Sequence, residues 1–249
     1  MHKSIPSVSL MDYSIFSGDL SELSFEKNIL ISTLNQYSFC IANEDLEFKE
    51  ALIKSDVLLP DGMAIVAAIQ LLKGKKIKKI AGADLHQFLL NDLNSKGGKC
   101  FYLGSSENTL TKITTRVSRE FPNIKFETFS PAYKTEFSDF ENQQMLKAIN
   151  SFNPDVLFVG MTAPKQEKWA YKNRDVIHAG TVCSIGAVFD FYAGTIQRPH
   201  SFWIQLRLEW FIRLIKEPKR MSKRYLYYGP IFINHIVKEG FRTVFSKKV

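Results

Sequence analysis

Short, mostly apolar runs alternate with longer segments of helical periodicity through most of this chain. Runs of four to eight such residues without regular polar alternation are typical of strands buried on both faces. They predict strands at residues 28–33, 57–59, 99–103, 124–129, 155–159 and 181–185. Apolar residues at helical spacing predict helices at residues 37–54, 63–72, 83–93 and 138–151, with others starting near 107 and 164. This alternation indicates the α/β class, a mostly parallel, doubly wound sheet. Residues 1–27 lack it and are interpreted as a strand and a hairpin.

The sharpest bend in the pattern is Pro60-Asp61-Gly62, between the strand at 57–59 and the helix at 63–72. Proline fixes φ and glycine accepts dihedrals that other residues avoid, so the chain turns there. The turn presents Asp61 at the carboxyl end of a strand, the edge at which open α/β sheets bind ligands. A carboxylate there can act as a base, hold a sugar hydroxyl or cap the helix, and the local pattern leaves these alternatives open.

Three predicted strands run directly into a glycine, at Gly104, Gly160 and Gly186. Glycine allows a ligand to approach the backbone closely, and the following helix N-terminus offers free N–H groups to an anion. A single junction of this kind is usually ordinary turn chemistry, but three in one chain favour a nucleotide or another phosphate-bearing ligand. The sequence lacks GxGxxG, so a dinucleotide-dependent oxidoreductase is disfavoured.

The basic residues are concentrated at the end of the chain. The whole sequence has a net charge of +8, yet residues 198–249 hold 12 Lys/Arg against 3 Asp/Glu, and residues 1–197 hold 21 against 22. We therefore divide the chain into a core, residues 1–197, and a basic appendage, residues 198–249. This asymmetry indicates an anionic partner, either a lipid surface or a nucleic acid.

The cysteine, histidine and hydropathy patterns indicate the cellular compartment of the protein. The three cysteines and the dispersed histidines show no metal-ligand spacing, so we expect reduced thiols and no metal site. The first residues lack a signal-peptide core, and the longest nearly apolar run, Tyr225–Val237, is shorter than the roughly 20 residues that span a bilayer. These patterns predict a cytoplasmic protein that does not cross a membrane.

The appendage itself combines apolar and basic positions. Apolar residues recur at helical spacing between Trp203 and Lys216, and Pro218 is expected to end that helix and begin another. Basic residues crowd the polar surface and tyrosines and phenylalanines follow. This helix either packs on the core with a solvated basic face or meets an anionic bilayer, which attracts each Lys or Arg by about 1 kcal/mol.

Six blocks occur together and in order between about residues 28 and 225. They are Thr33-Leu34-Asn35, LPDGMAIV around Asp61, AGADL at 81–85, GMTAPKQEKW at 160–169, IGAVFDFYAG at 185–194 and LEWFIRLIKEPKRMSKRY at 208–225. Together they resemble the WecG/TagA/CpsF glycosyltransferase family. The resemblance implies a Rossmann-like fold termed GT-E and an inverting transferase without a cofactor. It also implies transfer of a sugar, typically N-acetylmannosamine, from a UDP donor to undecaprenyl-diphosphate-linked GlcNAc at the cytoplasmic membrane face. Donors with a uronic acid or a hexose such as glucose are the alternatives.

The same resemblance assigns roles to individual residues. Asp61 matches the family's proposed base, and Thr33 and Asn35 would line its pocket, although both suit turn capping as well. The remaining candidates from the resemblance are Gln166 for the sugar or acceptor, Asp190 for the nucleoside, Tyr133 beside the uracil and Gly104 near the phosphates. Gly160 and Gly186 are substrate-binding candidates because of their strand-end positions. Arg213, Arg220 and Arg224 match arginines that the appendage of TagA-like members is thought to contribute. Glu167, beside Gln166, is equally interpreted as a first-turn helix carboxylate.

Two departures from the family pattern bear on these roles. Lys79 stands where the family often has arginine before AGxDL, which keeps the charge but loses bidentate geometry. Arg198-Pro199-His200 stands where the family has an Arg-Ala-Pro motif near the end of the core, so the local geometry there is expected to differ. The chain has no DxD triad, so a metal-independent mechanism fits, with arginines and helix N-termini meeting the charge of the departing UDP.

The expected partners are the UDP-sugar, the lipid-linked acceptor and an anionic membrane surface, with self-association a further expectation. A nucleic-acid-binding module that uses the basic appendage is the alternative from another class.

Overall fold

The computed structural model describes residues 5–25, 28–196, 203 and 209–246. Its centre is a six-stranded sheet in the order β4 (Val57–Pro60), β3 (Ile29–Leu34), β8 (Thr181–Ser184), β7 (Val156–Gly160), β5 (Lys99–Gly104) and β6 (Lys125–Phe129). All five neighbouring pairs run parallel. The predicted α/β class and strand positions are confirmed.

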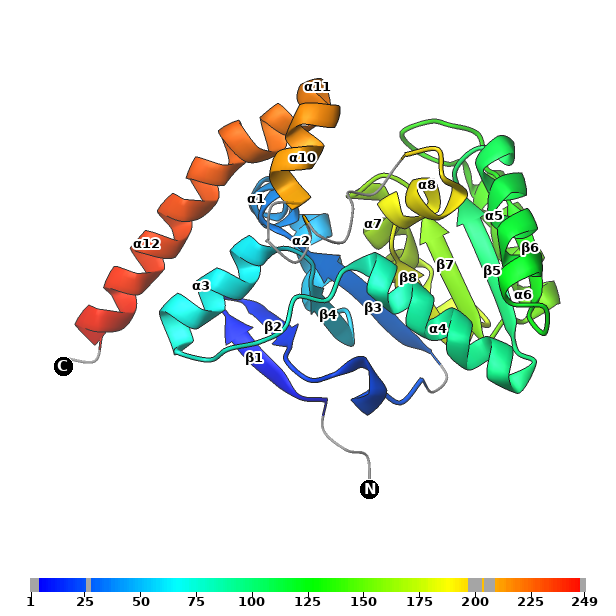
Figure 1. The fold of residues 1–249 in the computed structure, drawn as a ribbon, viewed down its shortest axis with the longest axis horizontal. Coiled ribbons are helices and arrows are strands. Elements are labelled where there is room, and N and C mark those ends of the chain that lie inside the picture. The colour runs from blue at the N-terminus through cyan, green and yellow to red at the C-terminus, as the bar shows by residue number, and fades with distance from the viewer. Residues whose placement is uncertain (1–4, 26–27, 197–202, 204–208, 247–249) are drawn as a thin grey trace.

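Helices cover both faces of this sheet (Figure 1). The helices in the described residues are α1 (Gln36–Glu44), α2 (Leu46–Ile53), α3 (Met63–Lys73), α4 (Gly82–Lys96), α5 (Glu107–Glu120), α6 (Asp139–Phe152), α7 (Lys165–Lys172), α8 (Ala187–Ala193), α10 (Glu209–Lys216), α11 (Pro218–Ser222) and α12 (Tyr228–Ser246). The last three do not cover the sheet, and α12 packs on α1 and α3. Shorter turns lie at η1 (Leu20–Glu22), η2 (Arg174–Val176) and η3 (Lys223–Tyr227), the last with π geometry.

Alternate residues of each strand pack into different cores. In β5, Cys100 and Tyr102 point to the face covered by α4, α5 and α8, whereas Phe101 and Leu103 point to α6 and α7. This results from the two-residue period of a strand, and it explains why the central strands are apolar at nearly every position.

The direction in which successive strands are added to the sheet reverses between β5 and β7. β5 continues through α5 to β6 on one side, and β7 continues through α7 to β8 on the other. Since α5 and α7 lie on opposite faces, the carboxyl ends of β5 and β7 border a crevice of the kind in which doubly wound sheets bind ligands.

The predicted helix over residues 37–54 is wrong in one respect: it is two helices. Asp45 separates α1 from α2 with an extended backbone, and its Oδ1 accepts a hydrogen bond from the Phe48 amide at 3.0 Å. An aspartate at an N-cap competes in this way with helix continuation. The expected N-terminal hairpin is confirmed as β1 (Ser7–Leu10) and β2 (Tyr13–Phe16).

The end of the chain returns to the core. Pro218 starts α11 as predicted. From α12, Tyr228, Phe232 and Ile236 are buried in a cluster with α1, α2, α3 and the N-terminal hairpin. The proposed boundary between residues 197 and 198 lies outside the described residues, as does Arg198-Pro199-His200, so the division into core and appendage stays a prediction. In the described parts of the chain, no helix combines the length and apolar character needed to cross a bilayer.

Candidate active site

Asp61 and Asn35 occupy adjacent strand ends. Leu34 of β3 pairs with Pro60 of β4, and each polar residue directly follows its member of that pair. The Asp61 amide donates to Leu34 O at 2.9 Å, which ties the turn to β3. The expected position of Asp61, at the carboxyl end of a strand beside a helix N-terminus, is thus the observed one.

Asn35 caps α1, because its Oδ1 accepts from the Ser38 amide at 3.0 Å. Thr33 is nearly buried within β3, opposite Leu59. The structure therefore brings Thr33 and Asn35 to the Asp61 end of the sheet. Their binding roles stay predictions, and capping is the role that the hydrogen bonds of Asn35 display.

The backbone beside Lys79 is hydrogen-bonded to the same edge of the sheet. The amide of the next residue, Ile80, donates to Pro60 O at 3.1 Å, one residue before Asp61. The AGADL block then begins α4, where Asp84 Oδ2 accepts from the Ala81 amide at 2.9 Å. A side chain at Gly82 would lie 3.2 Å from Val188, so this block packs on the IGAVFDFYAG block.

The three strand-end glycines pack tightly against the protein itself. Gly104 has φ +115°, and a Cβ there would lie 2.5 Å from Gly160 O. A Cβ on Gly160 would meet the Phe189 ring at 2.4 Å, and one on Gly186 would meet Met161 O at 2.5 Å. Close approach to a neighbouring strand end, to the Phe189 ring of α8 or to the loop after β7 is thus sufficient reason for glycine, and the phosphate role stays a prediction.

Distances along the sheet separate the candidate residues into two groups. Four inter-strand steps of about 4.8 Å place the ends of β4 and β5 about 19 Å apart. Asp61 and Gly104 therefore cannot contact the same sugar ring. A ligand that used both ends would extend along the edge, with its reacting group at β4 and its anionic or nucleoside part at β5 and β7.

Gln166 joins two loops of this edge. Its Oε1 accepts from the Gly186 amide at 3.0 Å, and its Nε2 donates to Glu167 Oε1 at 2.8 Å. Gln166 is 4% exposed, so its amide acts first as a link between the start of α7 and the start of α8.

Glu167 is the residue that sequence reasoning underestimated. It is 2% exposed, its Oε2 has no hydrogen-bond partner among the described residues, and burial raises its pKa to about 7. A glutamate at the third position of a helix usually accepts from the N-cap amide, but Pro164 is the N-cap here and has no N–H. That proline, three residues earlier, was the signal that Glu167 is not an ordinary capping carboxylate.

The appendage places two of its arginines beside this edge. The Arg213 guanidinium lies 5.3 Å from the Phe191 ring centroid on α8, and that of Arg224 lies 4.5 Å from Tyr37 on α1. α1 and α8 come directly after β3 and β8, which are neighbours in the sheet. The side chain of Arg220 lies outside the described part, so its predicted role stays open.

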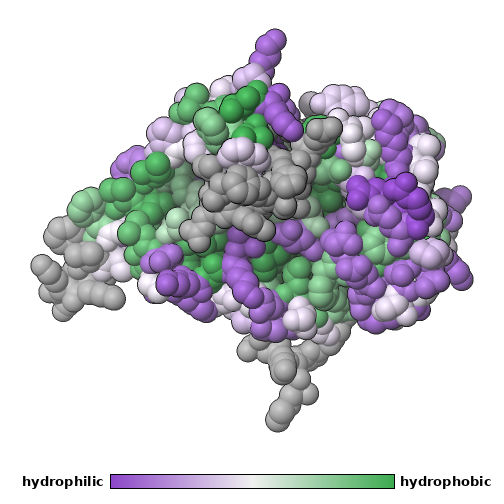
Figure 2. All heavy atoms as spheres, in the orientation of Figure 1, coloured by the Kyte–Doolittle hydropathy of each residue, from purple (hydrophilic) through white to green (hydrophobic). Residues whose placement is uncertain are grey.

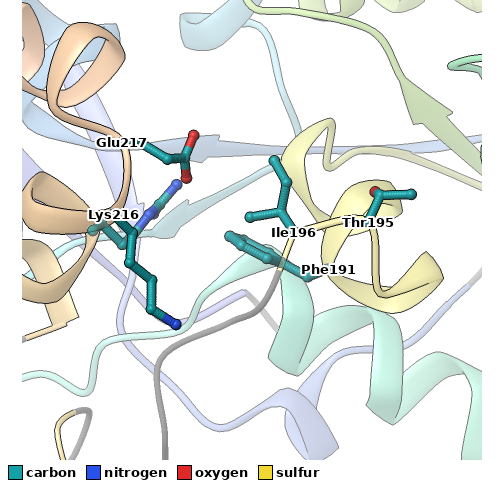
Figure 3. Close-up of a pocket in the computed structure, with 6 residues that line it drawn as sticks. Phe191, Thr195, Ile196, Lys216 and Glu217 are labelled. Carbon is teal, nitrogen blue, oxygen red and sulfur yellow. The ribbon is translucent and has the colours of Figure 1, made fainter.

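A pocket of about 370 Å³ lies between α8 and α10. Figure 3 shows Phe191, Thr195 and Ile196 on the α8 side, facing Lys216 and Glu217 on the other side. Arg213 also lines it, and its Nε is buried without a hydrogen-bond partner in the described chain. A half-buried guanidinium whose Nε has no partner among the described residues is suited to an anion.

Asp190 and Tyr133 differ in how closely they approach the site. Asp190 is half-buried on α8, and its Oδ1 accepts from Thr195 Oγ1 at 3.2 Å, next to the pocket. Tyr133 is fully exposed in the loop after β6, the far edge of the sheet from Asp61. The structure therefore groups Asp190 with Arg213 and leaves Tyr133 apart from both.

Buried histidine and cysteine side chains belong to the core. His86 hydrogen-bonds Tyr102 at 2.9 Å, and burial lowers its pKa to about 3. Cys40, Cys100 and Cys183 are buried free thiols. Within the described residues, no three His, Cys, Asp or Glu side chains are grouped as metal ligands.

The fold and this edge define an α/β protein whose candidate site is built from strand ends and completed by basic residues of a C-terminal helical segment. The family model of the WecG/TagA/CpsF glycosyl transferases matches residues 8–245. The chain belongs to this glycosyltransferase family.

Three curated relatives share one functional name. The chain is 31% identical to the N-acetylglucosaminyldiphosphoundecaprenol N-acetyl-beta-D-mannosaminyltransferase of Bacillus subtilis (strain 168), over 78% of this chain and 74% of the relative. Proteins of the same name match from Bacillus spizizenii at 28% (81% and 76%) and Staphylococcus aureus (strain MW2) at 27% (85% and 80%).

Proposed function

We propose that this protein transfers N-acetylmannosamine from a UDP donor to GlcNAc on undecaprenyl diphosphate, with inversion at the anomeric carbon. The relatives' names supply the acceptor and the transferred sugar. One structural observation carries the proposal: Asp61 lies at the end of β4, and two arginines of the appendage contact helices that begin at nearby strand ends. Arg213 on α10 contacts α8, which follows β8, and Arg224 in η3 contacts α1, which follows β3.

The proposed transfer is a single displacement. Asp61 takes the proton of the acceptor hydroxyl, and that oxygen forms a bond to the anomeric carbon of the sugar. The bond from this carbon to the diphosphate oxygen breaks, and UDP leaves with the electron pair. Attack from the face opposite the diphosphate inverts the configuration.

Positive charge near the leaving group lowers the barrier to this step. Arg213 and Arg224 would meet the charge that develops on the diphosphate, and the N-termini of α5, α7 and α8 add N–H donors along the same edge. In this proposal the two groups of site residues have different tasks: sugar transfer takes place at Asp61, and the nucleotide extends toward Gly104 and Gly160.

The lipid-linked acceptor requires contact with a membrane, and the surface of the appendage suits this. Figure 2 shows hydrophobic residues gathered over α12 and α3. On α12 the exposed large residues are Ile233, Val237 and Phe241, and basic side chains accompany them. We propose peripheral attachment to the inner face of the cell membrane, where basic and apolar side chains act together.

The test is UDP release from a panel of UDP-sugars, with and without a GlcNAc-diphosphate-lipid analogue, for the wild type and Asp61→Asn. Acceptor-dependent release from UDP-N-acetylmannosamine that is lost in Asp61→Asn is the expected result. Release from a UDP-hexose or a UDP-uronic acid instead would replace the proposed donor. Acceptor-dependent turnover that persists in Asp61→Asn would contradict the role of Asp61 as the base.

A further inference from the structure

We propose that Glu167 is a positioning residue of the transfer site, which holds the Gln166 amide so that it ties the α7 loop to the α8 turn. The inference rests on the proposed function for its effect on turnover, but the tie itself is a property of the fold. Glu167 Oε1 accepts from Gln166 Nε2 at 2.8 Å, and Gln166 Oε1 accepts from the Gly186 amide at 3.0 Å.

The orientation of the Gln166 amide depends on Glu167. A side-chain amide offers an oxygen at one end and N–H groups at the other, so either end can face Gly186. Gly186 presents an N–H and requires the oxygen. A carboxylate or carboxyl oxygen on the opposite side accepts from Nε2 and thereby favours this orientation over the flipped one.

The surroundings leave little freedom for an alternative arrangement. A Cβ on Gly186 would lie 2.5 Å from both Gln166 Oε1 and Met161 O, so the α8 turn is pressed against the α7 loop. The turn precedes Asp190 and Phe191, which lie beside the Arg213 pocket. A loosened Gln166 link would therefore displace the wall of the pocket that faces the appendage.

Burial of Glu167 is costly to the fold. Its side chain is almost completely buried, one carboxyl oxygen has no hydrogen-bond partner among the described residues, and the Pro164 N-cap offers no N–H. An apolar residue of similar length would avoid the desolvation of this carboxyl group. A purely structural role would thus be served better by methionine, whereas a positioning role requires the hydrogen-bond acceptor.

Two variants separate these roles. Glu167→Met removes the acceptor at similar length, and Glu167→Gln keeps an acceptor oxygen without the charge. Glu47→Gln is the matched control, since Glu47 is also in the first turn of a helix but has an 81% exposed side chain. The measurements are thermal unfolding, amide hydrogen exchange at Gly186, and donor kcat/KM with the acceptor analogue.

We expect Glu167→Met to unfold at or above the wild-type temperature, to exchange the Gly186 amide faster and to lose about tenfold in kcat/KM, the effect of one buried hydrogen bond. Glu167→Gln and Glu47→Gln should match the wild type in exchange and stay within about threefold in kcat/KM. Unchanged exchange at Gly186 in Glu167→Met would overturn the inference, as would wild-type kcat/KM. A lower unfolding temperature in both Glu167 variants would show a structural role and also overturn it.

Failure of the proposed function gives a different pattern. Suppose that the wild type releases UDP from none of the sugars while the Gly186 amide still exchanges faster in Glu167→Met. That result would contradict the proposed reaction and support the Gln166 link.

Discussion

Arg213 lies over the Phe191 ring with 5.3 Å between its guanidinium carbon and the ring centroid. This contact joins α10 of the appendage to α8 of the core and forms one wall of the pocket in Figure 3. Stacking holds the guanidinium plane, and the buried Nε has no hydrogen-bond partner among the described residues. The geometry explains how a segment distant in sequence contributes charge to the candidate site.

Replacement of Arg213 should slow transfer more than it weakens donor binding. Arg213→Ala removes a charge that acts on the departing diphosphate, and we expect kcat to fall about 100-fold, the usual effect of losing one such donor. Arg213→Lys should recover only part of this, since lysine cannot form the planar fork. Steady-state kinetics with the soluble acceptor analogue measure both. Arg242→Ala, at an 82% exposed side chain of α12, is the control and should keep wild-type kcat. If Arg213→Ala and Arg242→Ala lost the same factor in kcat, the effect would come from the net charge of the protein and not from the position of Arg213.

Asp61→Asn should retain the fold and UDP affinity while losing about 10²- to 10⁴-fold in kcat, the range for a general base. Calorimetric UDP binding and turnover on the same samples separate the two effects. Asp92→Asn, on the outer side of α4 in an ion pair with Lys96, should be neutral in both. Loss of UDP binding in Asp61→Asn would assign this residue to the nucleotide.

Stability should decrease as pH rises from about 4.5 to 7 because of Glu167. Burial raises its pKa from 4.5 to about 7, so in this window the folded state keeps a proton that the unfolded state releases. Proton release then favours unfolding, by a total of about 3 kcal/mol once the pH exceeds 7. Glu167→Gln cannot titrate and should lack this slope. Urea unfolding at several pH values compares the two proteins, and parallel pH profiles would contradict the raised pKa.

Gly104→Ala should destabilise the fold far more than Gly74→Ala. Both glycines have positive φ, +115° and +65°, but a Cβ at Gly104 would lie 2.5 Å from Gly160 O, whereas nothing lies within 4 Å at Gly74. We expect about 1 kcal/mol for Gly74→Ala from backbone strain alone, and about 3 kcal/mol or more for Gly104→Ala. Denaturant unfolding measures the difference, and equal losses would remove the packing explanation for this glycine.

Membrane attachment should depend on the exposed apolar side of α12. Replacement of Ile233, Val237 and Phe241 by serine removes apolar surface without touching the buried contacts of this helix. We expect binding to vesicles with anionic lipid to weaken at least tenfold. Leu46→Ser, at a 78% exposed residue of α2, is the control. Vesicle binding that is unchanged in the triple variant would place attachment elsewhere.

Local patterns determined the elements of this protein and the place of Asp61. Uninterrupted apolar runs identify strands that are covered on both sides, and their alternation with helices allows few topologies other than a doubly wound sheet. The Pro60-Asp61-Gly62 turn is similarly local, so its position at a strand end could be predicted from the sequence. The break at Asp45 was missed because an N-cap aspartate and a helical aspartate differ only in backbone conformation.

Only the tertiary structure decided which candidates share a site. Strand order places Asn35 beside Asp61 and Gly104 about 19 Å from Asp61, although the sequence treats all strand ends alike. Packing of α10 and η3 on α8 and α1 brings Arg213 and Arg224 to that edge. The role of Glu167 is the clearest case, because burial and the Pro164 N-cap together determine its hydrogen bonding. Spacing along the chain records only the order of the residues, whereas desolvation and hydrogen bonding depend on the groups that the fold places around each side chain.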